Sequence, residues 1–161
     1  MRKNQYAVKV IDGGLKGGSS EPIGAGTYKT SVNVHNPQQW QVDVDVKMVI
    51  SGANFKGKGE ITTWLPCVLR DDGSMEFDRE GFNFLCASSN PRITPPAFIE
   101  GWLVFECIVD YELDVWGIYT GNVFPGVANK AGPLATMHME QAIKRIVEME
   151  AKEDEKPRPR K

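Results

Sequence analysis

The sequence holds few of the residues from which metal centres and disulfide scaffolds are built. It contains three cysteines and two histidines among 161 residues. The cysteines, Cys67, Cys86 and Cys107, are odd in number and widely spaced, a pattern typical of reduced, buried thiols in a cytoplasmic protein. The histidines, His35 and His138, are far apart and no Cys-x-x-Cys pair is present. We therefore expect no metal site, no cofactor and no disulfide.

Long apolar runs and an excess of one charge are also missing. No stretch approaches the roughly 20 apolar residues that span a bilayer. The basic start of the chain, residues 1–12, lacks the apolar run of a secretion signal. The net charge of −2 gives no strong field that would attract nucleic acid or an anionic membrane. These absences predict a cytoplasmic protein with no membrane span and no nucleic-acid partner.

The sequence does contain the alternation typical of β-strands. Apolar residues occupy every second position from Trp40 to Ile50, which predicts a half-buried antiparallel strand. A similar period from Ile61 to Leu69 leads through the turn Asp71-Asp72-Gly73 to Met75 and Phe77, and this arrangement predicts a hairpin. Residues 99–109 and 113–119 are apolar at nearly every position and predict central strands covered on both faces.

The remaining segments complete a one-domain organisation. Residues 6–10 and 135–139 alternate like strands, and the apolar spacing of residues 142–147 predicts a short C-terminal helix. The glycine-rich residues 13–26 predict a mobile loop, and the charged residues 148–161 predict a disordered tail. We therefore expect residues 1–147 to form one all-β domain, an antiparallel β-sandwich of about seven or eight strands with that helix.

No motif in the chain predicts catalysis. The stretch from Gly24 to Thr30 has Tyr28 where a phosphate-binding loop needs glycine before the lysine, so we interpret it as a strand connector. Carboxylates at residues 43–45 and 71–78 are interpreted as solvated strand and turn residues. Calcium binding and a glycosidase-like carboxylate pair stay open as alternatives. We expect no catalytic residues and a protein that is not an enzyme.

Tryptophans are the candidate functional residues. Four of them fall on the predicted strands, at Trp40, Trp64, Trp102 and Trp116. Their positions within apolar alternation favour the core or a subunit interface, and a platform that stacks sugars or bases is the alternative. Trp64, Trp102 and Trp116 form the predicted interface or platform.

Three stretches resemble a family of small prokaryotic β-sandwich proteins. They are residues 28–37 (YKTSVNVHNP), residues 98–106 with 113–121 (FIEGWLVFE and LDVWGIYTG), and residues 136–140 (TMHME). Their layout is also similar to that of the sensory rhodopsin transducer group, whose members are antiparallel sandwiches that form homo-oligomers. The resemblance implies a sandwich fold and brings no catalytic residues with it.

The combined prediction is a non-enzymatic structural or protein-interaction module that assembles with itself, with another protein as a further candidate partner. A small-ligand-binding sandwich, with carbohydrate as one candidate ligand, is the first alternative, and a hydrolase on the same scaffold is the second. Large apolar residues on short strands motivate the assembly hypothesis.

Overall fold

The computed structural model describes residues 2–15, 26–51, 59–123 and 134–148. Within these ranges the chain forms ten strands and one helix. In chain order they are β1 (Arg2–Leu15), β2 (Gly26–His35), β3 (Val42–Ile50), β4 (Glu60–Ile61), β5 (Leu65–Leu69), β6 (Ser74–Phe77), α1 (Arg79–Ser88), β7 (Phe98–Ile108), β8 (Asp114–Val123), β9 (Leu134–Gln141) and β10 (Ile143–Glu148).

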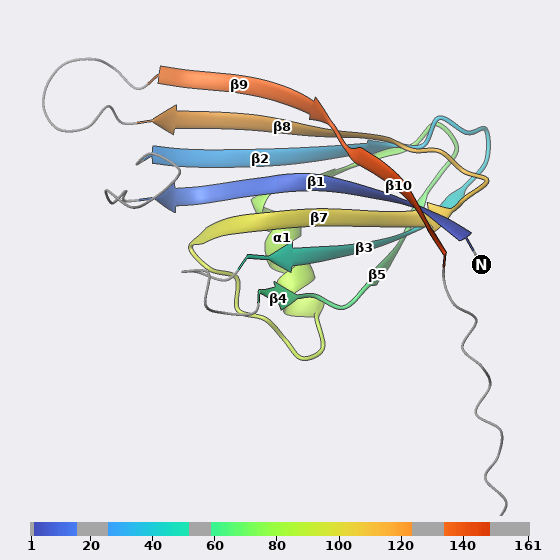
Figure 1. The fold of residues 1–161 in the computed structure, drawn as a ribbon, viewed down its shortest axis with the longest axis horizontal. Coiled ribbons are helices and arrows are strands. Elements are labelled where there is room, and N and C mark those ends of the chain that lie inside the picture. The colour runs from blue at the N-terminus through green and yellow to red at the C-terminus, as the bar shows by residue number, and fades with distance from the viewer. Residues whose placement is uncertain (1, 16–25, 52–58, 124–133, 149–161) are drawn as a thin grey trace, which may run out of the picture.

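All ten strands belong to one antiparallel sheet. Its main path runs β4-β3-β7-β1-β2-β8-β9 (Figure 1). Of the other strands, β10 pairs with β1, β5 with β3 and β6 with β2. The predicted all-β antiparallel class is therefore confirmed, although the strands are more numerous than expected and join a single sheet. The predicted central position of these strands is also confirmed, because β7 pairs with β1 and β3 while β8 pairs with β2 and β9. The predicted cover on both faces is wrong, because Trp102 of β7 and Trp116 of β8 are exposed on the other face.

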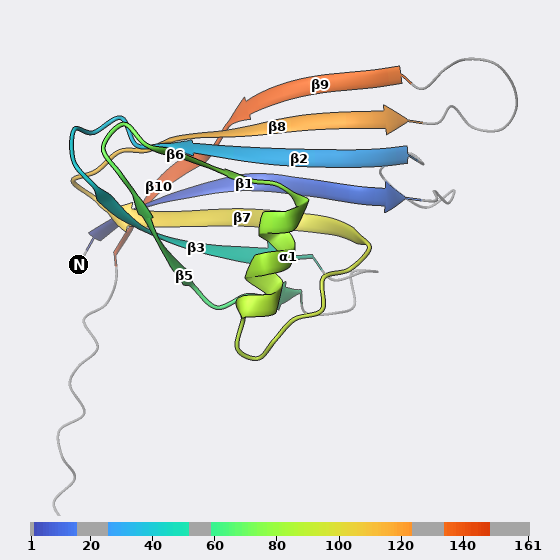
Figure 2. The same cartoon turned by 180° about the vertical axis from the view of Figure 1, so that it is seen from behind.

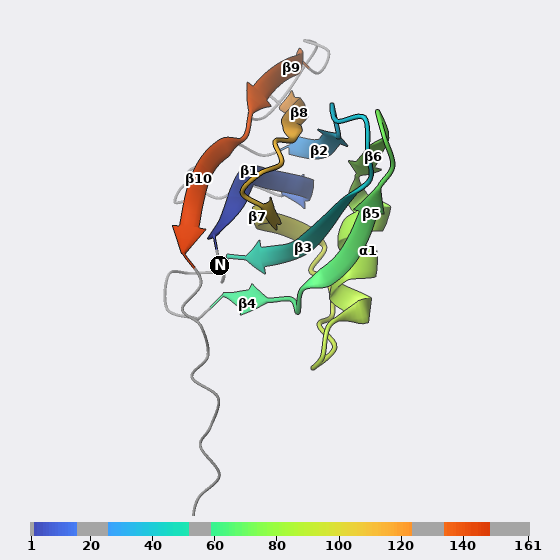
Figure 3. The ribbon, with the colours of Figure 1, turned by 90° about the vertical axis from the view of Figure 1, so that its right-hand side faces the viewer.

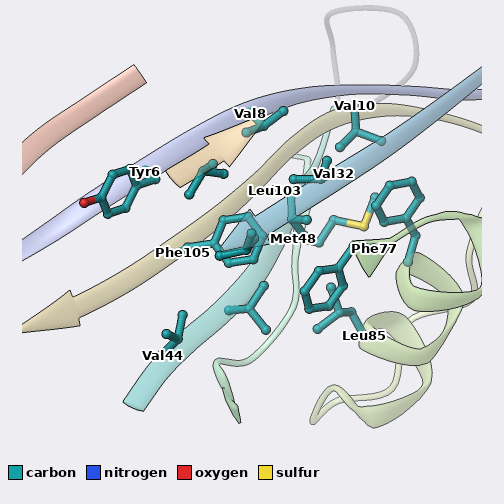
Figure 4. Close-up of a cluster of buried hydrophobic side chains, with 14 of the residues drawn as sticks. Tyr6, Val8, Val10, Val32, Val44, Met48, Phe77, Leu85, Leu103 and Phe105 are labelled. Carbon is teal, nitrogen blue, oxygen red and sulfur yellow. The ribbon is translucent and has the colours of Figure 1, made fainter. Parts of the chain in front are cut away.

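The bends of this sheet create three layers. Viewed from the side, β9 and β10 lie on one side of the central strands, and β5, β6 and α1 lie on the other (Figure 3). From behind, α1 lies across the central strands (Figure 2). The core fills the space between the central strands and the α1 layer (Figure 4). There the rings of Phe77 and Phe105 meet edge to face, with centroids 5.5 Å apart.

Strand β3 confirms the predicted alternation most clearly. Its even-numbered apolar residues from Val42 to Ile50 are buried, and the residues between them are partly or fully exposed. Because successive strand side chains point to opposite faces, one face of β3 enters the core and the other faces outward. Trp40, the predicted first member of the pattern, precedes the strand and is 52% exposed.

Helix α1 was not predicted, although its start carries a sequence signal. The Asp78 side chain caps the helix by accepting hydrogen bonds from the backbone N–H groups of Glu80 (2.9 Å) and Gly81 (3.3 Å). Phe82, Leu85 and Cys86 follow at helical spacing and are buried. These three residues form the apolar stripe that packs into the core.

The predicted C-terminal helix is wrong. Residues 143–148 form strand β10, which pairs antiparallel with residues 2–7 of β1. Strand β9 pairs with β8 up to Gln141, and the chain then bends at Ala142, whose N–H donates to Val115 O at 2.9 Å. The first half of β1 would otherwise leave a row of backbone groups unpaired, so pairing with β1 overrides the helical spacing.

Both edges of β1 are occupied, but in different ways. One edge pairs with β7 over residues 3–13, and the other pairs first with β10 and then, over residues 13–15, with β2. Between β10 and β2, the Thr30 hydroxyl accepts from Ile11 N (2.9 Å) and donates to Ile11 O (2.7 Å). The Tyr119 hydroxyl donates to Lys9 O at 2.9 Å. Side-chain hydroxyls thus supply hydrogen-bond partners to the backbone of β1 where its pairing with another strand is interrupted.

Two predicted segments fall largely outside the described residues. The glycine-rich run at 13–26 contributes its ends to β1 and β2, and residues 16–25 lie outside the described part. Of the predicted tail, Glu148 belongs to β10 and residues 149–161 lie outside the described part. In the described part of the chain, no helix has the length and apolar character needed to cross a membrane.

Candidate functional site

The outer face of strands β3, β7, β1 and β10, which is the face turned away from α1, is the main candidate site. Cross-strand pairing places directly opposed residues on the same face of a sheet. One row runs from Val49 through Trp102 to Lys9, and the next includes Lys47, Val104, Ala7 and Ile143. We call these two rows the outer face.

The outer face is hollowed beside β10. A depression of about 320 Å³ is lined by Ala7, Val49, Trp102, Val104, Ile143 and Arg145. Strand β10 forms one wall because it leaves the layer of the central strands (Figure 3). The lining is apolar except for Arg145, so the depression suits the apolar side chains of another protein.

Lysines lie over two of the three predicted tryptophans. The Lys47 ammonium is 4.1 Å from the ring centroid of Trp64, and that of Lys9 is 5.6 Å from Trp102. Lys9 also donates to Glu100 at 2.8 Å, which fixes its position. A sugar or base that stacks on the same face of either ring would have to displace its lysine.

The third predicted residue, Trp116, lies elsewhere. It stands on β8 opposite Asn33 of β2 and Gln141 of β9, whereas Trp102 stands on β7. The exposed fractions of Trp64, Trp102 and Trp116 are 37%, 36% and 38%. The structure therefore places Trp64 and Trp102 beside lysines of the outer face and does not bring Trp116 into the same rows.

A charged row borders the outer face at one end. Lys3 donates to Asp45 (3.0 Å) and to the buried Glu106 (3.3 Å), and Glu106 also accepts from Gln5 Nε2 at 2.6 Å. Arg145 completes the row by donating to Gln5 Oε1. Burial lowers the pKa of Lys3, but the hydrogen bonds and charges of Asp45 and Glu106 outweigh it, so the pKa is raised. This network fixes β10 against β1 and β7.

Strands β9 and β10 present an unpaired edge. Within the described residues, β9 pairs with β8 and β10 pairs with β1, each along one edge. Met139, Ile143 and Ile146 are 53%, 58% and 52% exposed on these strands. A free edge with exposed apolar side chains is a typical site for pairing with another strand.

His35 forms a separate cluster at the other end of β2. Its Nε2 is 2.9 Å from Asp72 Oδ1, and its Nδ1 is 3.3 Å from Asp114 Oδ2. Hydrogen bonds with Asp72 and then with Asp114 raise the pKa of His35. Asp72 has φ of 48°, as the predicted turn requires, but β5 and β6 on either side of it pair with β3 and β2. His35 thus connects β2 and β8 to this turn.

The stabilisation supplied by His35 is expected to depend on pH. Because its folded-state pKa is raised above the ordinary value of about 6.5, the contribution is full below that value and is lost as pH rises through the folded pKa. The melting temperature of the wild type should therefore exceed that of His35→Gln near pH 5.5, and the difference between the two temperatures should shrink near pH 8.5. Thermal unfolding of both proteins across this range measures the gap, and a gap independent of pH would contradict the prediction.

A larger cleft, of about 530 Å³, lies beside β2 and the start of α1. At this cleft the carboxylate of Asp12, with 7% of its side chain exposed, accepts from Arg79 Nη1 and from Thr30 N, both at 3.3 Å. Arg79 also donates to Pro96 O at 2.7 Å. Asp12 and Arg79 therefore hold each other in place at this cleft.

The acidic residues singled out from the sequence are used in separate contacts. Asp45 accepts from Lys3, Asp72 contacts His35, Glu76 accepts from Ser31 at 2.5 Å, and Asp78 caps α1. Among the described residues no three His, Cys, Asp or Glu side chains gather as a metal site would require. This dispersal gives no support to the calcium and glycosidase alternatives.

The three cysteines are free thiols. Cys86 and Cys107 are buried, and burial raises the pKa of Cys107 to about 11. Cys67 is partly exposed, and burial followed by the charge of Asp45 raises its pKa. A raised pKa disfavours the thiolate, which is the reactive form of cysteine.

The chain matches no protein-family model, and comparisons with curated proteins and with solved structures return no match either. The resemblance to the small prokaryotic sandwich family and to the transducer group therefore stays a prediction from the quoted residues.

Proposed function

We propose that this chain is a non-enzymatic, self-assembling protein-interaction module that works in the cytoplasm. The observation that carries the proposal is the free edge of β9 and β10, with Met139, Ile143 and Ile146 each more than half exposed. The apolar depression of the outer face lies directly beside this edge, since Ile143 lines it. Free thiols support the cytoplasmic location.

The energetics of association favour these apolar surfaces over surface charges. Burying apolar area gains about 25 cal/mol per Å² before the costs of association are subtracted. An exposed ion pair, by contrast, contributes at most about 1 kcal/mol. Assembly through the sheet should therefore persist in salt.

A small-ligand module is the second candidate, because the cleft beside α1 offers both carboxylates and cations to a polar ligand. Glu76, Lys29 and Arg79 line it together with Tyr28 and Ser31. Such a mixture of donors, acceptors and an aromatic ring suits a carbohydrate.

Sedimentation of the full chain and of a version ending at Glu148 tests the proposed assembly. We expect both to sediment as a multiple of the 17.9 kDa chain, at low salt and at about 0.5 M salt, where charges are strongly screened. The expectation follows because β10 and the outer face are intact in both proteins.

Two outcomes would contradict the proposal. If the shortened chain or the chain in high salt becomes monomeric, residues 149–161 or surface charges are the assembly element. If the full chain is monomeric throughout, the ligand module becomes the first candidate, and tryptophan fluorescence against a panel of sugars then tests it.

A further inference from the structure

We propose that two copies of this chain join by antiparallel pairing of β10 with β10 of the second copy, in a register centred on Ile146. This inference rests on the proposed self-assembly and names its interface. The pairing would continue the β3-β7-β1-β10 part of the sheet into the same strands of the second copy, in reverse order. It would also cover the free edge of β10 in both copies.

Strand β10 exposes apolar side chains on both of its faces. Ile143 stands opposite Ala7 and lines the depression of the outer face, whereas Ile146 stands opposite Asn4 and points to the other side. The two isoleucines are 58% and 52% exposed. A strand added to the free edge would shield both, because its side chains also alternate between the two faces.

The cations of β10 are held by their own subunit. Arg145 donates to Gln5 and Lys144 donates to Glu112. Charged side chains commonly protect a free edge from pairing. Here both cations contact neighbours in the same chain, so among the described residues they do not protect the edge in this way.

Charge selects one register for a pair of identical strands. Directly opposed residues must share a face, so the two registers that pair most of β10 with itself are centred on Arg145 and on Ile146. The first sets Arg145 against its own copy, and like charges directly opposite are destabilising. The second sets Ile146 against Ile146 and Lys144 against Glu148, twice because of the two-fold symmetry.

The register centred on Ile146 also yields alternating charges across the junction. Within one copy Glu148 lies 3.7 Å from Arg2 Nε, and Lys144 contacts Glu112. When Lys144 of one copy lies opposite Glu148 of the other, four charges follow one another across the junction. They are Arg2 and Glu148 of one copy, then Lys144 and Glu112 of the other, and each charge has the opposite sign to its neighbour. The existing surface thus already carries complementary charges for a second copy.

Cysteine cross-linking tests the register. Ile146→Cys should form a disulfide-linked dimer with a mild oxidant, since residue 146 opposes itself at a typical Cβ separation of about 5 Å. Ile143→Cys is the matched control, because it is equally exposed but would lie about 20 Å from its own copy. Wild type measures the background from the native cysteines. Linking of Ile143→Cys as strong as that of Ile146→Cys would overturn the proposed register.

A charge exchange gives an independent measurement on the intact chain. Lys144→Glu should weaken the dimer by about tenfold or more. In each of the two symmetric contacts, it places the new carboxylate opposite that of Glu148 in the other copy. Adding Glu148→Lys should recover most of the loss. Glu112→Gln, which removes only the contact within one subunit, should leave the dimer dissociation constant nearly unchanged. Sedimentation equilibrium measures each constant.

The results separate this inference from the assembly on which it rests. Cross-linking at residue 146 together with recovery in the double variant supports the β10 interface. Wild-type assembly without either result overturns the interface and leaves self-assembly standing. A wild-type monomer at all concentrations overturns both.

Discussion

Val44→Asp is expected to unfold the protein or cause it to aggregate. Val44 is 1% exposed in the middle of β3, within the core between the central strands and α1. The face is packed against apolar core residues, so a buried carboxylate there should cost about 4 kcal/mol or more. This loss is a large part of the free energy of unfolding of a typical domain, which is about 5–15 kcal/mol. Urea unfolding followed by circular dichroism measures the loss.

Asp43→Ser is the matched control, since Asp43 is the exposed neighbour on the same strand. It should change the free energy of unfolding by less than about 0.5 kcal/mol. Asp45→Ser, which alternation alone predicts to be neutral, should cost more because Asp45 accepts a hydrogen bond from Lys3. Equal losses from Val44→Asp and Asp43→Ser would contradict the assignment of faces.

Gly101→Ala is expected to disrupt the pairing of β3 with β7. A Cβ atom at residue 101 would lie 2.0 Å from the backbone oxygen of Val49 and 3.1 Å from Cα of Ile50. Both are backbone atoms of the neighbouring strand, so they cannot move aside without separating the strands. We expect a loss of about 3 kcal/mol or more, as in the severe cases of overpacking. The midpoint of chemical denaturation measures it.

Gly14→Ala provides the comparison. Nothing lies within 4 Å of a Cβ atom at residue 14. The substitution should be neutral or stabilise by a few tenths of a kcal/mol, roughly, because alanine reduces the freedom of the unfolded chain. A similar loss in both variants would show that glycine is needed in β1 and β7 for a reason other than space.

The parts of the fold that were predicted correctly are those in which local pattern and burial agree. Strand β3 alternates strictly because one face meets the core along its whole length. Strand β10 has the spacing of a helix, and only its pairing with residues 2–7, far away in sequence, makes it a strand. Helix α1 has a capping aspartate and a buried stripe, Phe82, Leu85 and Cys86, which helical periodicity could have identified.

The candidate site was predicted less completely, because register between distant strands determines it. The alternation of the sequence placed Trp64, Trp102 and Trp116 on strands but could not show which of them share a face. This placement is wrong for Trp64, which lies just before β5. The lysines over Trp64 and Trp102 come from β3 and β1, and no local signal connects them to those rings. The edge formed by Met139, Ile143 and Ile146 was missed because residues 142–147 were interpreted as a helix.

The divided edge of β1 has a consequence for protein synthesis. Residues 2–7 are synthesised about 140 residues before residues 143–148, which pair with them along one edge. Folding must therefore wait for a contact of very long sequence separation, which slows folding. Until then, the first half of β1 carries an open edge that a neighbouring nascent chain could occupy. A chaperone that shields the first strand during translation should therefore increase the yield of correctly folded chain.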